Sequence, residues 1–577
     1  MKGMSIRSKA LLLITGFLII STVYVSVTRS RIDYIVTSPF TVLNKLGVEY
    51  LAICFSWILY MFMLLFVRGS INDKQVLFTA SISVLMLTYL IYSLPRSLFE
   101  NQFYVDQLGF VLEVRSVTAN GHFQSFQGGL ESCGHALFSG IFAKILGVSY
   151  WSLTEWLPHL FVYLTVIMLF SSAKALLIGK EEKLRLRLLA MTVPILFLIT
   201  NFFSAFQYSR QSFAYPLHTL SILMLILMLT KRDMKHVIAY IILFSALLIS
   251  HPASSLIVAL MSLTAWIFMT IVSKFGIAIS QLSYRRLILS ISLFSILAWF
   301  SFQLSIYGSI VSFLKQTKVA FKELFESPIP ERTLVLGPGY TWEGYLYFSL
   351  RLRWGQFIIL MSTVLAITAI ILRRVDFIAK VIALWILLYV IGIGFTIYAH
   401  RWMDRPFQYL ALITPLLLVS LAKNHYRPTT VSIYSILIVG ILISPITIWG
   451  SSPFMYPPSS DIIMAQFLSN HAPETPHRVA YTGSHGLLPF YYKLNGKTLS
   501  GKDLLGSFKQ EIGFNVSEVC EYDIVAVFFR TYGKSGFYEY EPSIYVAVSD
   551  LQEGLVELGY NKIFEVVPGE EWAVTRV

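Results

Sequence analysis

Residues 236–273 read HVIAYIILFSALLISHPASSLIVALMSLTAWIFMTIVS, an almost unbroken apolar stretch that is interrupted only at Ser250-His251-Pro252. As one helix this stretch would be about 57 Å long at 1.5 Å per residue, nearly twice the roughly 30 Å of a bilayer's hydrocarbon core. Proline breaks a helix because it lacks the amide N–H and its ring collides with the preceding turn. The stretch therefore predicts two consecutive membrane spans joined by a very short turn.

The remainder of residues 1–450 repeats this pattern. The 577-residue chain has 56% hydrophobic and only 13% charged residues. Apolar runs of sufficient length predict about thirteen spans, near residues 10–28, 48–67, 75–94, 152–173, 188–203, 213–230, 236–250, 253–273, 287–306, 355–372, 381–398, 406–421 and 431–449. The predicted fold class is an α-helical polytopic membrane protein, and the first apolar run is expected to be an uncleaved span.

Lysine and arginine are distributed unevenly between the loops. If the N-terminus is cytoplasmic, basic residues make up roughly one position in three of the inner loops and roughly one in ten of the outer loops, as the positive-inside rule requires. The net charge of +13 is thus explained by the membrane rather than by a nucleic-acid partner. We expect a multi-pass protein of the cell (plasma) membrane, with its C-terminal tail outside the cytoplasm.

Three outer segments are long enough to carry function: residues 95–151, residues 307–354 and the tail, residues 451–577. The tail begins with a Pro-rich linker. Alternating patterns follow it, with helices predicted near 459–470, 502–511 and 549–558, and strands at 478–481, 522–529, 562–567 and 572–577. The sequence therefore predicts a transmembrane domain over residues 1–450 and a small extracytoplasmic α/β domain over residues 451–577.

The first outer segment carries a candidate catalytic carboxylate, Asp106. On a helical wheel Asp106 and Glu113 share one face while Leu108 and Val111 lie on the other, which predicts an amphipathic helix at the mouth of the bundle. A carboxylate at that place could act as a general base toward an acceptor hydroxyl. The alternative is that Asp106 caps the helix and Glu113 is simply solvated.

Cationic and polar groups recur at the outer ends of other spans: Tyr208, Arg210, His251, His400, Arg401 and Arg405. Basic residues on the outer side oppose the positive-inside tendency, and a phosphate headgroup would account for them, because arginine binds phosphate with a planar, two-pronged fork. Each also has a structural alternative. Arg401 or Arg405 could pair with Asp404, and His251 could cap a broken helix.

Aromatic residues in the second outer segment, such as Tyr340 and Trp342, could stack on a sugar ring, although a belt of aromatic side chains at the membrane interface is the alternative. His122, Glu131 and His135 are conceivable metal ligands, but they lack a tight ligand spacing such as HExxH. We therefore predict no metal site and no certain cofactor, with a divalent cation as a minor alternative.

Several short segments of the sequence together resemble the first external loop and later helix ends of the GT-C superfamily of membrane glycosyltransferases. This superfamily includes protein O-mannosyltransferase-like, aminoarabinose transferase-like and archaeal enzymes. The resemblance rests on Tyr104-Val105-Asp106, Asn120-Gly121-His122-Phe123, Gly134-His135-Ala136-Leu137, Leu146-Gly147-Val148-Ser149, Ser250-His251-Pro252 and Arg401 through Tyr409. It implies an extracytoplasmic active site, a polyprenyl- or dolichyl-phosphate sugar as donor, and Asp106 near the reacting centre. Many relatives carry paired acids where this chain has only Asp106.

The expected function is transfer of a sugar from a lipid-linked donor to an unknown glycan, lipid or protein acceptor on the extracytoplasmic face. Nucleotide sugars are not expected outside the cell, so a donor that arrives in the membrane suits this topology. Three alternatives remain open: a flippase or transporter of lipid-linked saccharides, a polymerase or ligase of such saccharides, and a non-catalytic GT-C-like scaffold. A transporter would favour charged residues at mid-membrane, and the predicted spans contain few.

Overall fold

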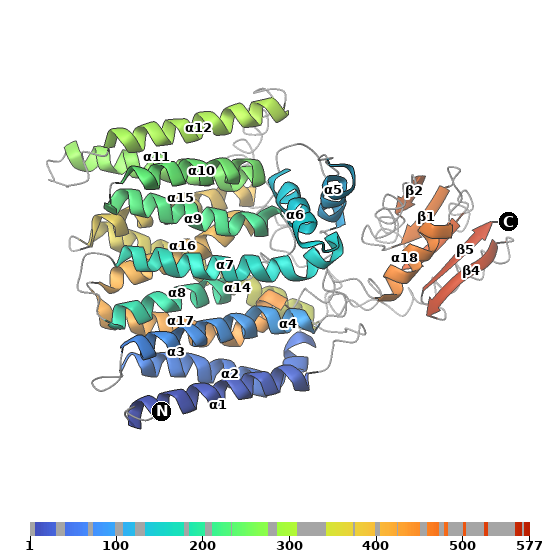
Figure 1. Cartoon of the computed structure of the whole chain (residues 1–577), viewed down its shortest axis with the longest axis horizontal. Coiled ribbons are helices and arrows are strands. Elements are labelled where there is room, and N and C mark those ends of the chain that lie inside the picture. Colours follow the sequence, from blue (N-terminus) through green and yellow to red (C-terminus); the bar gives the residue numbers. More distant parts are fainter. Residues whose placement is uncertain are drawn as a thin grey trace.

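Long helices packed side by side form most of the molecule, and a small α/β unit lies beyond one end of them (Figure 1). The structure is a computed structural model. It describes residues 6–29, 41–66, 73–98, 108–121, 133–177, 184–201, 210–231, 233–274, 285–307, 342–372, 375–398, 404–423, 425–449, 459–471, 478–482, 500–503, 524–528, 560–567 and 571–576.

The helix bundle contains the elements that coincide with the predicted spans. They are α1 (Ile6–Thr28), α2 (Thr41–Leu64), α3 (Asp73–Thr88), α7 (Tyr150–Leu176), α8 (Leu184–Thr200), α9 (Arg210–Lys231), α10 (Met234–Ser250), α11 (Pro252–Lys274), α12 (Arg285–Tyr307), α14 (Trp342–Ile371), α15 (Phe377–Tyr398), α16 (Asp404–Ala422) and α17 (Tyr426–Trp449).

Within the described residues, nine helices are long and apolar enough to cross a membrane: α1, α2, α3 with its continuation to Ser97, α7, α9, α11, α12, α14 and α17. The chain is therefore a multi-pass membrane protein. Helices α8, α10, α15 and α16 coincide with the other predicted spans but do not belong to that set. A topology of about thirteen crossings accordingly stays a prediction.

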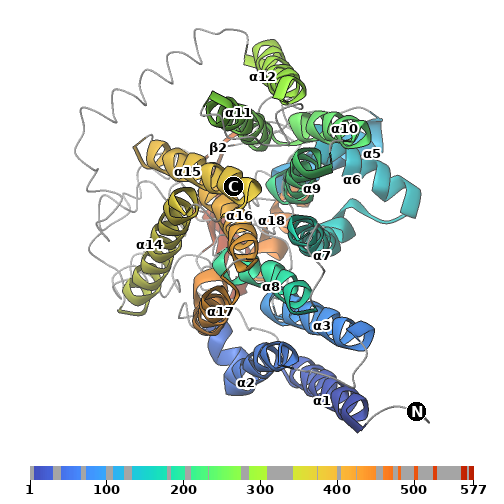
Figure 2. The same cartoon turned by 90° about the vertical axis from the view of Figure 1, so that its left-hand side faces the viewer.

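Helices α8 and α16 lie at the centre of the bundle (Figure 2). Every residue of α8 from Leu188 to Thr200 is buried, as are the residues of α16 from Phe407 to Ala422. Peripheral helices instead expose large apolar side chains, such as Leu13 and Phe17 of α1. Lipid tails solvate such side chains, so a hydrophobic exterior is stable in a membrane.

The predicted break in the opening stretch is confirmed, since α10 ends at Ser250 and α11 begins at Pro252. Helix α14 begins at Trp342, before the predicted start of its span at residue 355, and its membrane-length apolar part begins at Ser349. The charged residues Arg351 and Arg353 interrupt the apolar run there. Tertiary contact still supports the helix: Trp354 is buried, and its indole N–H donates to the carbonyl of Ile199 at 3.3 Å.

The first outer segment is more structured than predicted. Helix α3 continues through the π-helix η1 (Tyr89–Ser93) into α4 (Leu94–Ser97), and two further helices follow, α5 (Leu108–Asn120) and α6 (Cys133–Leu146). Both lie at one end of the bundle, called here the α5/α6 end (Figure 1).

The amphipathic helix was predicted to include Asp106 and to leave one polar face toward the bundle mouth. Helix α5 begins at Leu108, so Asp106 precedes it and lies outside the described residues. The alternative that Glu113 is solvated is wrong, because its side chain is fully buried together with Val111 and Val114. Packing of α5 against α6 and α7 covers both of its faces, which a helical wheel of a single segment cannot reveal.

The C-terminal unit contains helix α18 (Ser459–His471) and a five-stranded sheet in the order β2-β1-β3-β5-β4. The strands are β1 (Arg478–Thr482), β2 (Ser500–Asp503), β3 (Ile524–Phe528), β4 (Tyr560–Val567) and β5 (Glu571–Arg576). Strands β2, β1 and β3 are parallel, while β5 is antiparallel to both β3 and β4. Helix α18 and the strands β1, β3, β4 and β5 agree with the predicted positions within a few residues.

One prediction in this unit was wrong where it can be checked. A helix was expected over residues 502–511, but residues 500–503 form β2, paired with β1 in the register Arg478↔Ser500. The local sequence Ser-Gly-Lys-Asp has low strand propensity, so pairing with β1 decides the conformation. The helix predicted near 549–558 lies outside the described residues.

Candidate functional site

The turn between α10 and α11 lies at the α5/α6 end and consists of His251, between the last residue of α10 and the first residue of α11. Pro252 occupies the first position of α11, where its missing N–H costs nothing because no intrahelical acceptor exists for it there. The buried His251 side chain caps the same helix, since its Nδ1 accepts a hydrogen bond from the backbone N–H of Ser254 at 3.2 Å. The capping role weighed from the sequence is therefore confirmed. A neutral ring used in this way carries its proton on Nε2.

The first turn of α11 is joined to α16 through side chains. The hydroxyl of Ser254 is hydrogen-bonded to the phenol of Tyr409, and Tyr409 lies within the first two turns of α16. The neighbouring Gln408 accepts hydrogen bonds from the side chains of Gln211 and Tyr215 of α9. The N-terminal turns of α9, α11 and α16, far apart in the sequence, are thereby held together.

Deeper in the bundle a second set of polar contacts continues this network. His218 of α9 is fully buried, and its Nε2 lies 3.0 Å from the phenol oxygen of Tyr389 on α15. The His218 ring also packs on that of Tyr409, with centroids 4.2 Å apart. Buried polar groups in a membrane protein require such partners, and these contacts favour one relative arrangement of the helices that contribute to them.

Helix α6 packs directly against the α10–α11 turn. A Cβ atom at Gly134 would lie 2.5 Å from the hydroxyl oxygen of Ser250, so only glycine allows this close approach. The next residue, His135, is fully buried, and its ring contacts Phe110 of α5 and Phe213 of α9 at centroid distances of 5.8 and 5.9 Å. Helices α5 and α6 are thus placed beside the N-terminal turn of α9.

The arrangement brings the N-termini of three helices close together. The N-terminus of a helix carries a partial positive charge and amide N–H groups without intrahelical partners, and phosphate groups bind at such termini. Arg210 is the first residue of α9, and Arg405 is the second residue of α16. Two of the predicted basic positions therefore lie in the first turns of α9 and α16, which the network holds together. His251 immediately precedes the first turn of α11, the third helix of the network.

The predicted site residues are only partly described. Asp106, Tyr208, His400, Arg401 and Tyr340 lie outside the described residues, as do the conceivable metal ligands His122 and Glu131. For Arg210, Arg405 and Trp342 the structure describes the helical backbone but not the side chain. Among the described residues no group of three or more His, Cys, Asp or Glu side chains is arranged to hold a metal ion.

Several polar residues of this region were not among the predicted site residues. Gln211, Tyr215 and His218 recur at helical spacing along one face of α9, in a mainly apolar span whose other polar residues are mostly serine and threonine. Polar residues inside a span are rare and are usually functional, so this stripe was a usable signal. The buried arginine Arg96 lies at the predicted outer end of the third span, so the argument from unusual outer cations applied to it as well.

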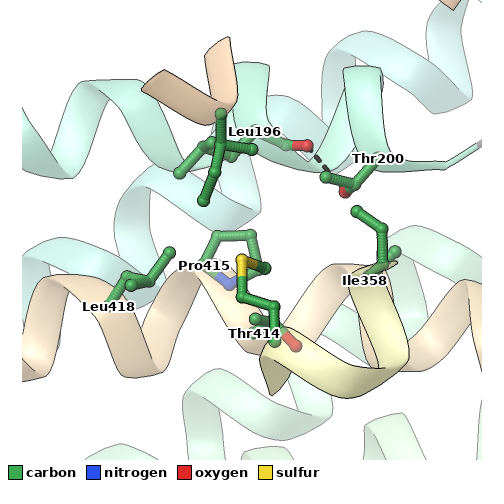
Figure 3. Close-up of a pocket in the computed structure, with 9 residues that line it drawn as sticks. Leu196, Thr200, Ile358, Thr414, Pro415 and Leu418 are labelled. Atoms are coloured by element: carbon green, nitrogen blue, oxygen red, sulfur yellow. Dashed lines mark hydrogen bonds between the residues drawn. The ribbon is translucent and has the colours of Figure 1, made fainter. Parts of the chain in front are cut away.

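An apolar pocket lies between α8, α14, α16 and α17 (Figure 3). Its cavity volume is only about 10 Å³, which is roughly the space of one water molecule. Two threonines line it, but their hydroxyls donate to carbonyls of their own helices: Thr200 to Leu196 at 2.7 Å and Thr414 to Leu410 at 2.9 Å. The lining therefore presents mainly hydrocarbon.

No protein-family model and no curated protein sequence matches the chain. Among solved structures the chain is similar to arabinofuranosyltransferase AftD from Mycobacteria, with 12% identity and a TM-score of 0.45 over 88% of this chain and 40% of AftD. It is also similar to ArnT from Cupriavidus metallidurans in the apo state, with 12% identity and a TM-score of 0.40 over 82% of this chain and 93% of ArnT. For ArnT bound to undecaprenyl phosphate the identity is 11% and the TM-score 0.37, over 88% and 99% of the two chains.

Proposed function

We propose that this chain is a membrane glycosyltransferase that moves a sugar from a polyprenyl- or dolichyl-phosphate donor to an acceptor hydroxyl at the α5/α6 end of the bundle. The acceptor belongs to a glycan, a lipid or a protein. In this proposal the α5/α6 end is extracytoplasmic, the N-terminus is cytoplasmic, and residues 451–577 form a domain outside the membrane.

The observation that carries the proposal is the joining of three helix N-termini. Hydrogen bonds between Gln211 and Gln408, and between Ser254 and Tyr409, hold the first turns of α9, α11 and α16 together. The resulting partial positive charges, with the arginines at positions 210 and 405, favour a phosphate group at this place. The phosphate of a lipid-linked sugar is such a group, and it arrives through the membrane.

The apolar lining of this small pocket is compatible with a lipid as the donor's carrier. It is lined by α16, the same helix whose first turn takes part in the proposed phosphate site, and by α8, α14 and α17. A donor whose phosphate binds at the N-terminus of α16 could place the first part of its hydrocarbon tail along this helix. Contact between apolar surfaces would then add to the affinity that the phosphate supplies.

For the chemical step we propose Asp106 as general base. The carboxylate takes the proton of the acceptor hydroxyl, the acceptor oxygen attacks C1 of the sugar, and the bond between C1 and the phosphate oxygen breaks. The lipid phosphate leaves with the bonding electrons, and configuration at C1 is inverted. The cationic groups and helix N-termini stabilise the negative charge that grows on the leaving phosphate.

The test uses the full-length protein in nanodiscs with polyprenyl-phosphate sugars that carry different hexoses or pentoses. Release or transfer of the sugar is measured by mass spectrometry of the lipid. We expect activity in the wild type and none in Asp106→Asn, at unchanged yield and thermal stability. Asp73→Asn, which removes an exposed carboxylate at the other end of α3, is the matched control and should retain full activity.

Two results would refute the proposal. Asp106→Asn with near-normal transfer would exclude Asp106 as the base. Movement of intact donor between the leaflets, without loss of its sugar and at the same rate in both variants, would identify a transporter instead.

A further inference from the structure

A buried arginine, Arg96, joins the end of the third span to the start of α7. Only 1% of its surface is exposed. Its Nη1 donates to the phenol oxygen of Tyr92 at 3.0 Å, and its Nη2 donates to the backbone carbonyl of Thr154 on α7 at 2.9 Å. A buried guanidinium in a membrane protein is costly, so a specific use for it is expected.

The backbone carbonyl that accepts from Arg96 lies about one turn before a proline in α7. Thr154 lies four residues before Pro158, which is inside α7. In a regular helix the N–H of residue 158 would bond the carbonyl of residue 154, but proline has no N–H. The guanidinium of Arg96 thus donates to the same carbonyl oxygen that an ordinary residue at position 158 would have used.

The π-helix η1 brings further groups to the same place. A π-helix inserts an extra residue into a turn and so rotates the residues that follow it. Ser93, the last residue of η1, has its hydroxyl 3.0 Å from Nδ1 of His159, and the ring of Tyr92 contacts that of His159 with centroids 5.5 Å apart. Three contacts therefore connect η1 and α4 with residues 154–159 of α7.

This connection lies at the boundary between two hydrophobic clusters. On the N-terminal side of Pro158, Leu153 and Leu157 belong to the cluster that contains α5 and α6. On its C-terminal side, Phe161 still belongs to that cluster, whereas Val162 and Val166 belong to the main core of the bundle. The part of α7 up to Phe161 consequently packs with the α5–α6 pair, and Pro158 lies about one turn before the point where α7 joins the main core.

We propose that Arg96 is a positioning residue, which replaces the N–H that Pro158 lacks and so fixes the α5–α6 pair, with Glu113 and His135, against the transmembrane bundle. A proline alone would leave α7 free to bend at this point. With Arg96 bonded to Thr154, one orientation of the first two turns is selected. The proposal concerns the structure of this end of the bundle and does not depend on a transferase activity.

The test compares Arg96→Met, Pro158→Ala and the double variant by hydrogen–deuterium exchange in nanodiscs. Arg96→Met removes the guanidinium donor from a buried carbonyl, so we expect amide exchange in α5, α6 and residues 150–157 to increase roughly five- to tenfold. Exchange in α12, on another side of the bundle (Figure 2), should not change. Pro158→Ala supplies a backbone N–H that can bond the Thr154 carbonyl, so the double variant should return at least half of the lost protection.

Two further variants separate positioning from general stability. Arg96→Lys keeps a donor of similar reach and should rescue most of the protection, whereas Arg353→Met removes an exposed arginine of α14 and should have no effect. If Arg96→Met gives no folded protein, Pro158→Ala must restore its yield in the double variant. Equal exchange or yield in the single and double variants, or a uniform increase that includes α12, would overturn the proposal.

Discussion

Replacement of Gln408 by leucine tests whether hydrogen bonds hold the three helix N-termini together. Gln408 is almost fully buried on α16, and its side-chain oxygen accepts from both Gln211 and Tyr215 of α9. Leucine has a similar volume but no acceptor, so two donors on α9 lose this acceptor. The change should loosen the contact between α9 and α16 without opening a large cavity.

The expected loss of stability follows from those two donors. A buried donor without an acceptor costs about 1–3 kcal/mol in soluble proteins, while hydrogen bonds between membrane helices average about 0.6 kcal/mol. Two such bonds therefore bracket the loss between roughly 1 and 6 kcal/mol, and we expect about 2 kcal/mol. The triple variant Gln211→Leu/Tyr215→Phe/Gln408→Leu removes the donors together with their acceptor. It should therefore recover most of the lost stability.

The assay has two readouts on the same detergent-solubilised protein. The free energy of unfolding is measured by titration with denaturing detergent, and the Kd for polyprenyl phosphate is measured by native mass spectrometry. We expect Gln408→Leu to lower the free energy of unfolding and to raise the Kd for polyprenyl phosphate about tenfold, since the phosphate-binding turns are no longer held in place. In the triple variant stability should return, but the affinity should not return fully, because apolar contacts specify the orientation of the helices less strictly.

Two outcomes would refute this reasoning. Wild-type stability in Gln408→Leu would mean that the hydrogen bonds to Gln211 and Tyr215 do not form. Normal affinity for polyprenyl phosphate in a clearly destabilised Gln408→Leu would separate the network from the proposed phosphate site. Gln356→Leu, at an exposed glutamine of α14, is the matched control and should leave both readouts unchanged.

Two further substitutions probe the neighbourhood of the site. Met361→Trp places a larger side chain in the lining of the apolar pocket and should weaken polyprenyl phosphate binding severalfold. Leu360→Trp, at a position that is 66% exposed on the same helix, should not, and equal affinities would exclude the pocket lining as a tail site. Gly134→Ala places a Cβ 3.2 Å from the Cα of Ser250 and should lower thermal stability, at a cost of about 1–3 kcal/mol. Gly16→Ala has no atom within 4 Å of the new methyl group and should leave the melting temperature unchanged, so equal shifts would contradict the close packing of α6.

Local signals predicted the helices well, because each span must satisfy its own backbone and present apolar side chains to lipid. The break at His251 followed from proline geometry alone. The errors came where a tertiary contact overrides the local pattern. Trp354 holds α14 to the bundle beyond its apolar run, and β2 takes its conformation from β1.

The candidate site was predictable where a residue stands out within its own segment. His251 was recognised because it breaks a span, and Arg210 and Arg405 because outer cations are unusual. The burial of Glu113 was missed, since its partners α6 and α7 come from later in the chain. Asp106 was singled out from its sequence context, and its role stays a prediction.

The sequence by itself determined that the chain crosses the membrane many times, because apolar length and the distribution of basic residues are properties of each segment taken alone. Only the tertiary structure decided which segments meet. Gln211 and Gln408 are 197 positions apart, Ser254 and Tyr409 are 155 apart, and no periodicity links them. Their contact depends on how the helices pack around α16, and that packing is a property of the whole bundle.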